Sequence, residues 1–488
     1  MSDAWIITQL PWPAELPASA EREVAWLDGV TAGEQRPGTA RYSLLCDTPL
    51  VVLVKHDGQA ARLVGGAQVI AEDGSGWALW RLVQRALPRL PATPFGVGPG
   101  WVGYVGFEMA AELERLPALR RADLGLPLMR LALYDTAVVL DHADQRAYRV
   151  AASPACVEAI RVVLANLARD HPNRARNFAA FAPDTRAAGS DTPSNAAPRL
   201  TADMPRAAYE RMVRRALAYI AAGDIYQVNL AQRFRLIWLD DPLALYLAAR
   251  RSNPASYSAL LRWDGGAVAS FSPELFLQLR GNEVLSRPIK GTRPRTGDPV
   301  RDKALRRELL ASAKEAAELA MIVDLHRNDL GRVCRYGSVR VVHPRRIEAH
   351  PSVFHTVADI RGELAPDRDG IDLLAACFPA GSISGVPKIR ALEIIGELEP
   401  AARGVYTGAI GVLGLDGQMT FNVAIRTLQM CGGHSWLYVG GGIVADSDPA
   451  AEYDETLAKA AGILRGLGLC PPRESSDTRT ACNDIGSA

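Results

Sequence analysis

Short apolar runs alternate along the chain with longer segments in which apolar residues recur every three or four positions. The short runs predict strands at residues 41–45, 49–54, 131–140, 147–152, 224–234, 257–261, 268–272, 275–279, 339–342, 353–364, 406–413, 419–429, 435–439 and 440–444. The longer segments predict helices at residues 77–87, 154–169, 205–222, 301–323, 389–398 and 449–467. Many strands with helices between them indicate a mixed α and β protein.

Residues 182–200 interrupt this pattern, because they are rich in Pro, Ala, Ser, Thr and Asp and show no periodicity. We expect them to form a linker between an N-terminal region, residues 1–181, and a second region, residues 201–468. Residues 469–488 are expected to form a flexible tail. Most of the residues with recognisable chemistry lie in the second region, where we therefore expect the functional site.

The composition narrows the class of ligand. The 488 residues include 55 Lys and Arg against 54 Asp and Glu, so no overall field attracts nucleic acid or an anionic membrane. The seven cysteines are scattered without a CxxC pair, and the N-terminus has neither a basic start nor a long apolar run. We therefore expect a cytoplasmic protein that recognises a small molecule locally.

The segment of residues 288–295, PIKGTRPR, places one lysine between constrained backbone positions. Pro288 and Gly291 flank Lys290 and predict a tight turn, which the apolar pair Val284-Leu285 enters as a strand. A lysine delivered into an enclosed space loses solvation, its pKa falls, and the neutral amine becomes a nucleophile. Taken alone, the segment fits a solvated surface lysine equally well.

Two pairs of glutamates have helical spacing. Glu315 and Glu318 lie three residues apart on one predicted helix, and Glu452 and Glu455 lie three apart on another. Each pair therefore lies on one face of its helix. If the two faces meet, the carboxylates repel unless a cation joins them, and oxygen ligands suit Mg²⁺. Two solvated helix faces are the alternative interpretation.

A glycine-rich strand and two cations suggest an anion site. Gly440, Gly441 and Gly442 allow close approach of a ligand to the backbone, whose N–H groups bind carboxylates. Arg426 is predicted in the middle of an apolar strand, either at a sheet edge or as a buried clamp for an anion. Lys459 on the last helix would add a second positive charge.

Two further residues have chemistry that depends on their surroundings. Glu274 precedes the lysine segment by one strand, and in a dry site its carboxyl would stay protonated and act as a general acid. A turn carboxylate that caps a backbone N–H is the alternative. His355 would orient a substrate hydroxyl, or would be a core histidine with its hydrogen bonds satisfied.

Together these residues resemble the chorismate-utilising enzyme family. The resemblance rests on eight strings in the expected order over residues 205–467: GDIYQVNLAQRF, SFSPELF, PIKGTRPR, MIVDLHRNDLGRV, FPAGSISGVPKIRALEIIGELEP, YTGAIG, IRTL and GGGIVADSDPAAEYDETLAK. It implies an α+β fold, a large α/β sandwich of two mostly antiparallel β-sheets with helices on the outside. Residues 1–181 would be the accessory region of the family, and residues 201–468 the chorismate-binding catalytic domain.

The lysine resembles the branch of aminodeoxychorismate synthase component I, because anthranilate synthases usually have alanine at this position. The resemblance implies amination of chorismate at C4 to 4-amino-4-deoxychorismate, for 4-aminobenzoate and folate biosynthesis. Lys290 would attack C2 and expel the C4 hydroxyl, Glu274 would be the general acid, and ammonia would then add at C4. Two shifts of the ring double bonds replace a poor direct displacement.

The same resemblance implies the remaining roles. Mg²⁺ would be held by Glu318 and Glu455, with support from Glu315 and Glu452. Substrate would be bound by Thr292, His355, Tyr406, Arg426, Gly440, Gly441, Gly442 and Lys459. The glycine-proline loop at residues 378–388, FPAGSISGVPK, departs slightly from the family pattern. It has Ser384 and Val386 where Thr and Ala are common.

The source of ammonia would be a separate protein. The sequence shows no glycine-rich nucleophilic cysteine with a partner histidine, so the resemblance implies a glutamine amidotransferase subunit. Two other readings stay open: an isochorismate, salicylate or anthranilate synthase of the same family, and a non-catalytic protein that only binds chorismate or regulates an amidotransferase.

Overall fold

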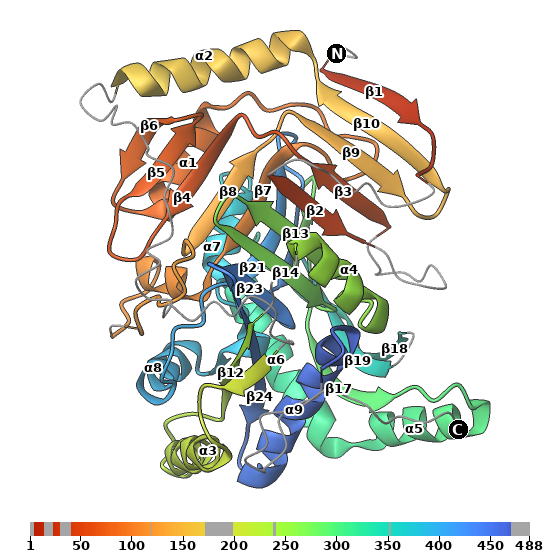
Figure 1. Cartoon of the computed structure of the whole chain (residues 1–488). Helices are drawn as coiled ribbons and strands as arrows, with labels where there is room; N and C mark the ends of the chain where they lie inside the picture. The colour runs from red at the N-terminus through yellow and green to blue at the C-terminus, as the bar shows by residue number, and fades with distance from the viewer. Residues whose placement is uncertain are drawn as a thin grey trace.

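The computed structural model describes residues 4–13, 23–29, 41–117, 119–170, 199–237, 241–350 and 353–469. These residues form two twelve-stranded sheets, and the strand pairs that define the order of each sheet are antiparallel (Figure 1). Apolar side chains from both sheets meet between them, among them Val102, Ile410, Val139 and Ala259. The predicted sandwich of two antiparallel sheets is therefore confirmed.

The first sheet runs, in spatial order, through β1 (Trp5–Leu10), β10 (Arg146–Ala152), β9 (Thr136–Asp141), β3 (Tyr42–Cys46), β2 (Val24–Asp28), β13 (Tyr257–Trp263), β14 (Gly266–Ser272), β23 (Thr427–Cys431), β24 (His434–Ile443), β12 (Gln227–Ile237) and β11 (Arg199–Ala202). The short strand β20 (Gly385–Val386) also pairs with β12.

The second sheet runs through β17 (Ile289–Pro294), β19 (Val353–Glu363), β16 (Glu283–Arg287), β15 (Leu275–Arg280), β22 (Met419–Val423), β21 (Ala409–Gly414), β7 (Gly100–Val105), β8 (Met129–Leu133), β4 (Val51–Lys55), β5 (Ala61–Gly65) and β6 (Gln68–Asp73). Strand β18 (Arg340–Ala349) pairs with β19.

The helices are α1 (Gly76–Ala86), α2 (Pro154–Asp170), α3 (Arg206–Ala221), α4 (Pro242–Ser252), α5 (Pro299–Ala311), α6 (Ala313–Gly331), α7 (Gly370–Cys377), α8 (Lys388–Leu398) and α9 (Pro449–Gly466). Helices α4 and α9 cover the outer face of the first sheet. There Tyr246 stacks on Phe271, with ring centroids 5.3 Å apart, and contacts Trp26 edge-on. These contacts bury the apolar stripe of each helix against a sheet.

The N-terminal region and the second region share both sheets. Strand β2 pairs with β13 in the first sheet, and β7 pairs with β21 in the second. This pairing places residues far apart in sequence opposite each other, such as Trp26 and Leu260. The expected linker and the expected tail lie outside the described residues, except that Arg199 and Leu200 begin β11 and Leu469 follows α9.

The predicted helix at residues 301–323 is wrong, because two helices occupy this segment. Ser312 has extended backbone angles, φ −65° and ψ 110°, which end α5 and begin α6. Its hydroxyl accepts a hydrogen bond from the Glu315 backbone N–H at 3.3 Å, as an N-cap does. Helix α6 then continues to Gly331, beyond the predicted end.

The predicted strand at residues 419–429 is also divided, and Arg426 does not lie in the middle of a strand. Strand β22 belongs to the second sheet and β23 to the first, so the chain crosses between the sheets at residues 424–426. Arg426 lies in this crossover with a left-handed φ of 52°. The crossover carries the guanidinium to the place where the two sheets meet.

The lysine lies in a strand, and the prediction of a tight turn there is wrong. Lys290 is the second residue of β17 and pairs with Thr356 of β19. Gly291 has a φ of 80° and interrupts the register between Lys290 and Thr292. The glycine therefore produces a local irregularity in a paired strand, as a bulge does. The predicted preceding strand is confirmed as β16.

Candidate active site

The candidate site lies where β17 and β19 of the second sheet approach β24 of the first, beside α6 and α9, in the lower half of the molecule (Figure 1). Three residues that are distant in sequence but in contact define its centre: Lys290, Ser382 and Glu274. The Lys290 amine donates to the backbone carbonyl of Ser382 at 3.4 Å, and the Ser382 hydroxyl donates to Oε1 of Glu274 at 2.6 Å. The structure thus brings the predicted nucleophile and the predicted acid to one residue.

Burial sets the protonation of both groups. Glu274 is 3% exposed, and burial raises the pKa of its carboxyl to about 7, although the Ser382 hydroxyl and Lys290 act in the opposite direction. Burial lowers the pKa of Lys290, although Glu318 and Glu274 favour its charged form. A carboxyl that is still partly protonated near neutral pH and an amine that loses its proton more easily than usual are suited to acid and nucleophilic catalysis.

The glycines of β24 form one wall of the site, because neighbouring atoms, including side chains of the site, occupy the space that Cβ atoms would need. A Cβ at Gly440 would lie 3.0 Å from Oη of Tyr406, and one at Gly441 would lie 2.9 Å from Oε2 of Glu452. A Cβ at Gly442 would lie 3.4 Å from the Lys290 amine nitrogen. Glycine at these three positions therefore lets the side chains of the site pack directly against β24, and binding of a ligand by this backbone stays a prediction.

Lys459 and Tyr406 lie beside this wall. The Lys459 amine donates to the Gly440 carbonyl at 2.7 Å and forms an ion pair with Glu455 at 2.7 Å. Tyr406 precedes β21, which begins later than predicted, and its ring stacks on Tyr438 with centroids 5.4 Å apart. These contacts hold one cation and one phenol at the glycine wall.

Arg426 faces the site without a counter-ion. Among the described residues, no carboxylate pairs with its guanidinium and no hydrogen bond restrains it. Burial alone lowers the pKa of Arg426, with no opposing contribution from an acidic group. A desolvated guanidinium is costly unless an anion joins it, so this position fits a substrate carboxylate.

His355 and Thr292 form a pair across the β17–β19 ladder. Nδ1 of His355 lies 2.9 Å from the Thr292 hydroxyl, and Nε2 is buried without a hydrogen-bond partner in the described part of the chain. Burial lowers the pKa of His355 well below its ordinary value, and Arg426 adds to this effect. The ring is therefore neutral, with one polar nitrogen available to a ligand.

The four predicted metal-binding glutamates come from α6 and α9. Glu318 makes no hydrogen bond or ion pair with a described residue, and burial raises its pKa, with a smaller contribution from Glu455. Glu452 accepts from the Ser447 hydroxyl at 2.6 Å, and Glu315 pairs with Arg293 at 3.4 Å. Burial favours a raised pKa for Glu455, but Lys459 outweighs it and the pKa is lowered.

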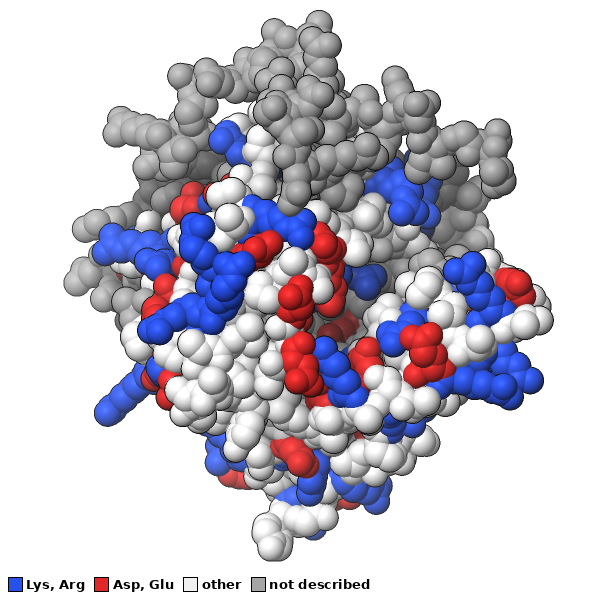
Figure 2. All heavy atoms as spheres, turned by 90° about the horizontal axis from the view of Figure 1, so that it is seen from below, with Lys and Arg blue, Asp and Glu red and all other residues white. Residues whose placement is uncertain are grey.

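These carboxylates fit a hard cation without forming a completed site. Within the described ranges, no group of three His, Cys, Asp or Glu side chains is close enough to hold a metal ion. The face seen from below shows acidic side chains around a hollow, with cations beside them (Figure 2). The half-buried Glu318 carboxylate without a partner and the all-oxygen donor set suit Mg²⁺.

Two residues of the site were missed by sequence reasoning. Ser382 lies in the glycine-proline loop, and its contacts to Lys290 and Glu274 depend on long-range packing. Gln227 is fully buried, and both polar atoms of its amide lack a partner among the described residues. Its Nε2 would lie 2.6 Å from a Cβ at Gly442. The strings GDIYQVNLAQRF and FPAGSISGVPKIRALEIIGELEP contained both residues, but nothing local marked them.

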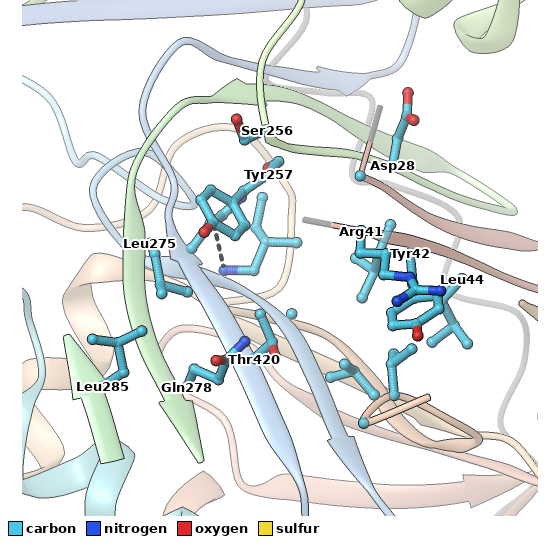
Figure 3. A pocket seen from close by; sticks show the side chains of 18 of the residues that line it. Asp28, Arg41, Tyr42, Leu44, Ser256, Tyr257, Leu275, Gln278, Leu285 and Thr420 are labelled. Atoms are coloured by element: carbon cyan, nitrogen blue, oxygen red, sulfur yellow. Dashed lines mark hydrogen bonds between the residues drawn. The ribbon is translucent and has the colours of Figure 1, made fainter. Parts of the chain in front are cut away.

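A cavity of about 320 Å³ lies elsewhere, between the sheets (Figure 3). Tyr42, Tyr257, Gln278 and Thr420 are among the residues around it. Lys290 and the other predicted site residues do not line it. This cavity is therefore separate from the candidate active site.

Comparison with known proteins shows the family of the chain. A family model described as chorismate binding enzyme matches residues 48–465, so the chain belongs to the chorismate-binding enzyme family. The anthranilate synthase component 1 of Streptomyces coelicolor is 43% identical over 397 residues, 80% of this chain and 76% of that protein. The aminodeoxychorismate synthase component 1 of Klebsiella aerogenes is 38% identical over 463 residues, 94% and 98% of the two chains.

A solved structure supports the same fold. The crystal structure of anthranilate synthase component I from Streptococcus pneumoniae has a TM-score of 0.71 and 30% identity, covering 89% of this chain and 94% of that chain. The relatives carry two different activity names, so the similarity shows the family and leaves the choice between the activities to the site. None of the helices in the described part of the chain is long and apolar enough to cross a bilayer.

Proposed function

We propose that the protein aminates chorismate at C4 to give 4-amino-4-deoxychorismate, as a component I of aminodeoxychorismate synthase. The observation that carries this proposal is Lys290, a lysine of lowered pKa beside the protonatable carboxyl of Glu274. Direct addition of ammonia at C2, the reaction of an anthranilate synthase, needs no amine from the protein. The relative from Klebsiella aerogenes, matched over nearly its full length, supports the same choice.

The proposed reaction balances in two allylic steps. The neutral Lys290 amine forms a bond to C2, the ring double bond shifts, and the C4–oxygen bond breaks. Glu274 gives its proton to the departing hydroxyl, which leaves as water, and then accepts a proton from the alkylated lysine. Ammonia adds at C4 and the double bond shifts back. Glu274 returns its proton to the lysine nitrogen, which leaves as a neutral amine, and the new C4 nitrogen remains as an ammonium group.

The remaining residues bind and orient the substrate in this proposal. Arg426 and Lys459 would hold carboxylates, with the β24 backbone as a hydrogen-bond donor. The Nε2 atom of His355 would contact the departing hydroxyl. Glu318 and Glu455, with Glu315 and Glu452 behind them, would hold Mg²⁺, which would neutralise a substrate carboxylate.

Ammonia would come from a separate glutamine amidotransferase subunit, since relatives are named as component 1 and so have a second component. The product would serve 4-aminobenzoate and folate synthesis, and we place the reaction in the cytoplasm. A second candidate is anthranilate synthase, favoured by the 43% identity to the Streptomyces coelicolor protein.

Product analysis tests these alternatives. The purified chain is incubated with chorismate, Mg²⁺ and an ammonium salt, with and without an added aminodeoxychorismate lyase. We expect 4-aminobenzoate only when the lyase is present, and loss of turnover when a chelator removes Mg²⁺. Anthranilate or isochorismate as the main product would overturn the proposal, and unchanged chorismate would favour a non-catalytic binding protein.

A further inference from the structure

The loop between α7 and α8 places one residue against both reacting side chains. Ser382 is 4% exposed, and its hydroxyl donates to Oε1 of Glu274 at 2.6 Å. Its backbone carbonyl accepts from the Lys290 amine at 3.4 Å. The two polar groups of Ser382 are separated by only a few covalent bonds, so they fix the spacing between acid and amine.

The first sheet holds this loop in place. Strand β20 pairs with β12, and the Asn229 backbone N–H donates to the Ser384 carbonyl at 2.8 Å. The buried guanidinium of Arg403 donates to the Ile383 carbonyl at 3.2 Å. The residues that directly follow Ser382 are therefore tied to neighbouring elements through contacts that its own side chain does not make.

The start of α8 anchors the other end of the loop. The Lys388 amine donates to the Cys377 carbonyl at 2.9 Å and to the Asp329 carboxylate at 2.7 Å, so it joins α7, α8 and α6. The loop thus has fixed attachments at both ends. A rigid support of this kind is what a residue needs if it is to hold two catalytic groups in a productive geometry.

Each contact has a chemical consequence. A carbonyl only accepts hydrogen bonds, so it holds one N–H of the neutral Lys290 amine and thereby orients the lone pair. The hydroxyl fixes the rotation of the Glu274 carboxyl, whose proton must reach the leaving oxygen. Donation from Ser382 also favours the ionised carboxyl, which opposes the effect of burial on the Glu274 pKa.

We propose that Ser382 is a positioning residue, which aligns the Glu274 carboxyl with the Lys290 amine through its hydroxyl and its carbonyl. The proposal rests on the proposed function, because that function assigns Glu274 as the acid and Lys290 as the nucleophile. Ser382 itself does not need to touch the reacting carbon atoms.

Two alanine variants in the same loop test this role. Ser384 is also buried, but its hydroxyl donates to the Ala380 carbonyl at 3.0 Å, within the loop. We expect Ser382→Ala to lower kcat by about tenfold to a hundredfold, with the KM for chorismate changed less than about twofold. The fall of kcat at high pH, which follows ionisation of Glu274, should move to higher pH because the hydroxyl that favours the ionised carboxyl is removed. Ser384→Ala should change neither the kcat nor the pH at which kcat falls.

A spectroscopic measurement separates this proposal from the proposed function. The infrared carboxyl band of Glu274, assigned by its loss in Glu274→Gln, should titrate near pH 7 in the wild type and at higher pH in Ser382→Ala. If Ser382→Ala does not fold, Ser382→Cys, nearly isosteric and a weaker donor, should show the same upward movement. Equal midpoints in the wild type and both loop variants, or equal kcat values, would overturn the positioning role.

A wild-type chain that forms no aminated product would instead count against the proposed function. The infrared midpoints do not depend on turnover, so they still decide whether Ser382 controls Glu274. Failure of the proposed function and failure of the positioning role of Ser382 are therefore distinguishable.

Discussion

Lys290 lies against the backbone of Gly442: a Cβ at residue 442 would be 3.4 Å from the lysine amine nitrogen. The same Cβ would lie 2.6 Å from Nε2 of Gln227, which is closer than real Cβ contacts allow. The absence of a side chain at 442 thus leaves room for a buried amine and a buried amide side by side. The amine comes from the second sheet and the glycine from the first.

Gly442→Ala should therefore impair catalysis through displacement of these groups. We expect the turnover of chorismate to fall about a hundredfold, since misplacement of a catalytic group by about 1 Å costs that much. Gly74→Ala is the control, because a Cβ there meets nothing within 4 Å and the backbone is not left-handed. Steady-state kinetics on both folded variants check this, and normal turnover in Gly442→Ala would contradict the close packing.

Removal of the amine should change the product as well as the rate. In Lys290→Ala we expect the formation of aminodeoxychorismate to fall at least about a thousandfold, because the proposed nucleophile is removed. Slow formation of anthranilate should remain, through direct addition of ammonia. Lys303→Ala, on the exposed surface of α5, serves as the control.

Mass spectrometry of the intact wild-type protein tests the covalent step directly. Quenching during turnover should reveal an added mass that is absent in Lys290→Ala. Full retention of the aminated product in Lys290→Ala would show that the amine is not the nucleophile.

The raised pKa of Glu274 links activity and stability to pH. In the proposed mechanism Glu274 must be protonated to act as the acid, so activity at a constant concentration of free ammonia should decline as the pH rises through about 7. The folded pKa lies above the ordinary value, so the stability that the protonated carboxyl provides is lost over the same rise. From the shift to about 7, the loss is on the order of 3 kcal/mol.

Glu274→Gln isolates this contribution, because glutamine cannot ionise. We expect the variant to be inactive, to unfold at a higher temperature than the wild type at pH 8.5, and to match it at pH 5. Thermal unfolding at the two pH values checks the difference. A variant less stable than the wild type at pH 8.5 would show that the ionised carboxylate is well accommodated.

The sequence predicted most elements whose apolar pattern is long and regular. Helices α3, α8 and α9 begin and end within about two residues of their predicted limits. The paired glutamates also lie on the helices where their spacing placed them, since that argument is local. The two-sheet architecture came from the family resemblance, because periodicity alone does not tell which strands pair.

The remaining features depend on contacts that are distant in sequence. The apolar run around Arg426 continues on both sides, so nothing local showed that the chain changes sheets there. Ser312 ends a helix in a segment rich in helix-forming residues, because its side chain caps the next one. Ser382 reaches Glu274 across 108 positions of sequence, through a loop fixed by β12.

Arg426 and Arg403 provide a contrast between an arginine that we propose binds substrate and one that supports the fold. Arg403 is 1% exposed and pairs with Glu399 at 2.6 Å, whereas Arg426 is partly buried and has no carboxylate partner in the described structure. Arg426→Met should lower kcat/KM for chorismate about tenfold to a hundredfold, mainly through KM, because a charged hydrogen bond to substrate is lost.

The unfolding free energy of Arg426→Met should stay equal to that of the wild type or rise, since no buried carboxylate loses its partner. Arg403→Met should instead lower that free energy by about 3–5 kcal/mol by leaving Glu399 unpaired. Chemical denaturation and kinetics of both variants check the contrast, and destabilisation of the same size in Arg426→Met would mean that Arg426 has a structural counter-ion after all.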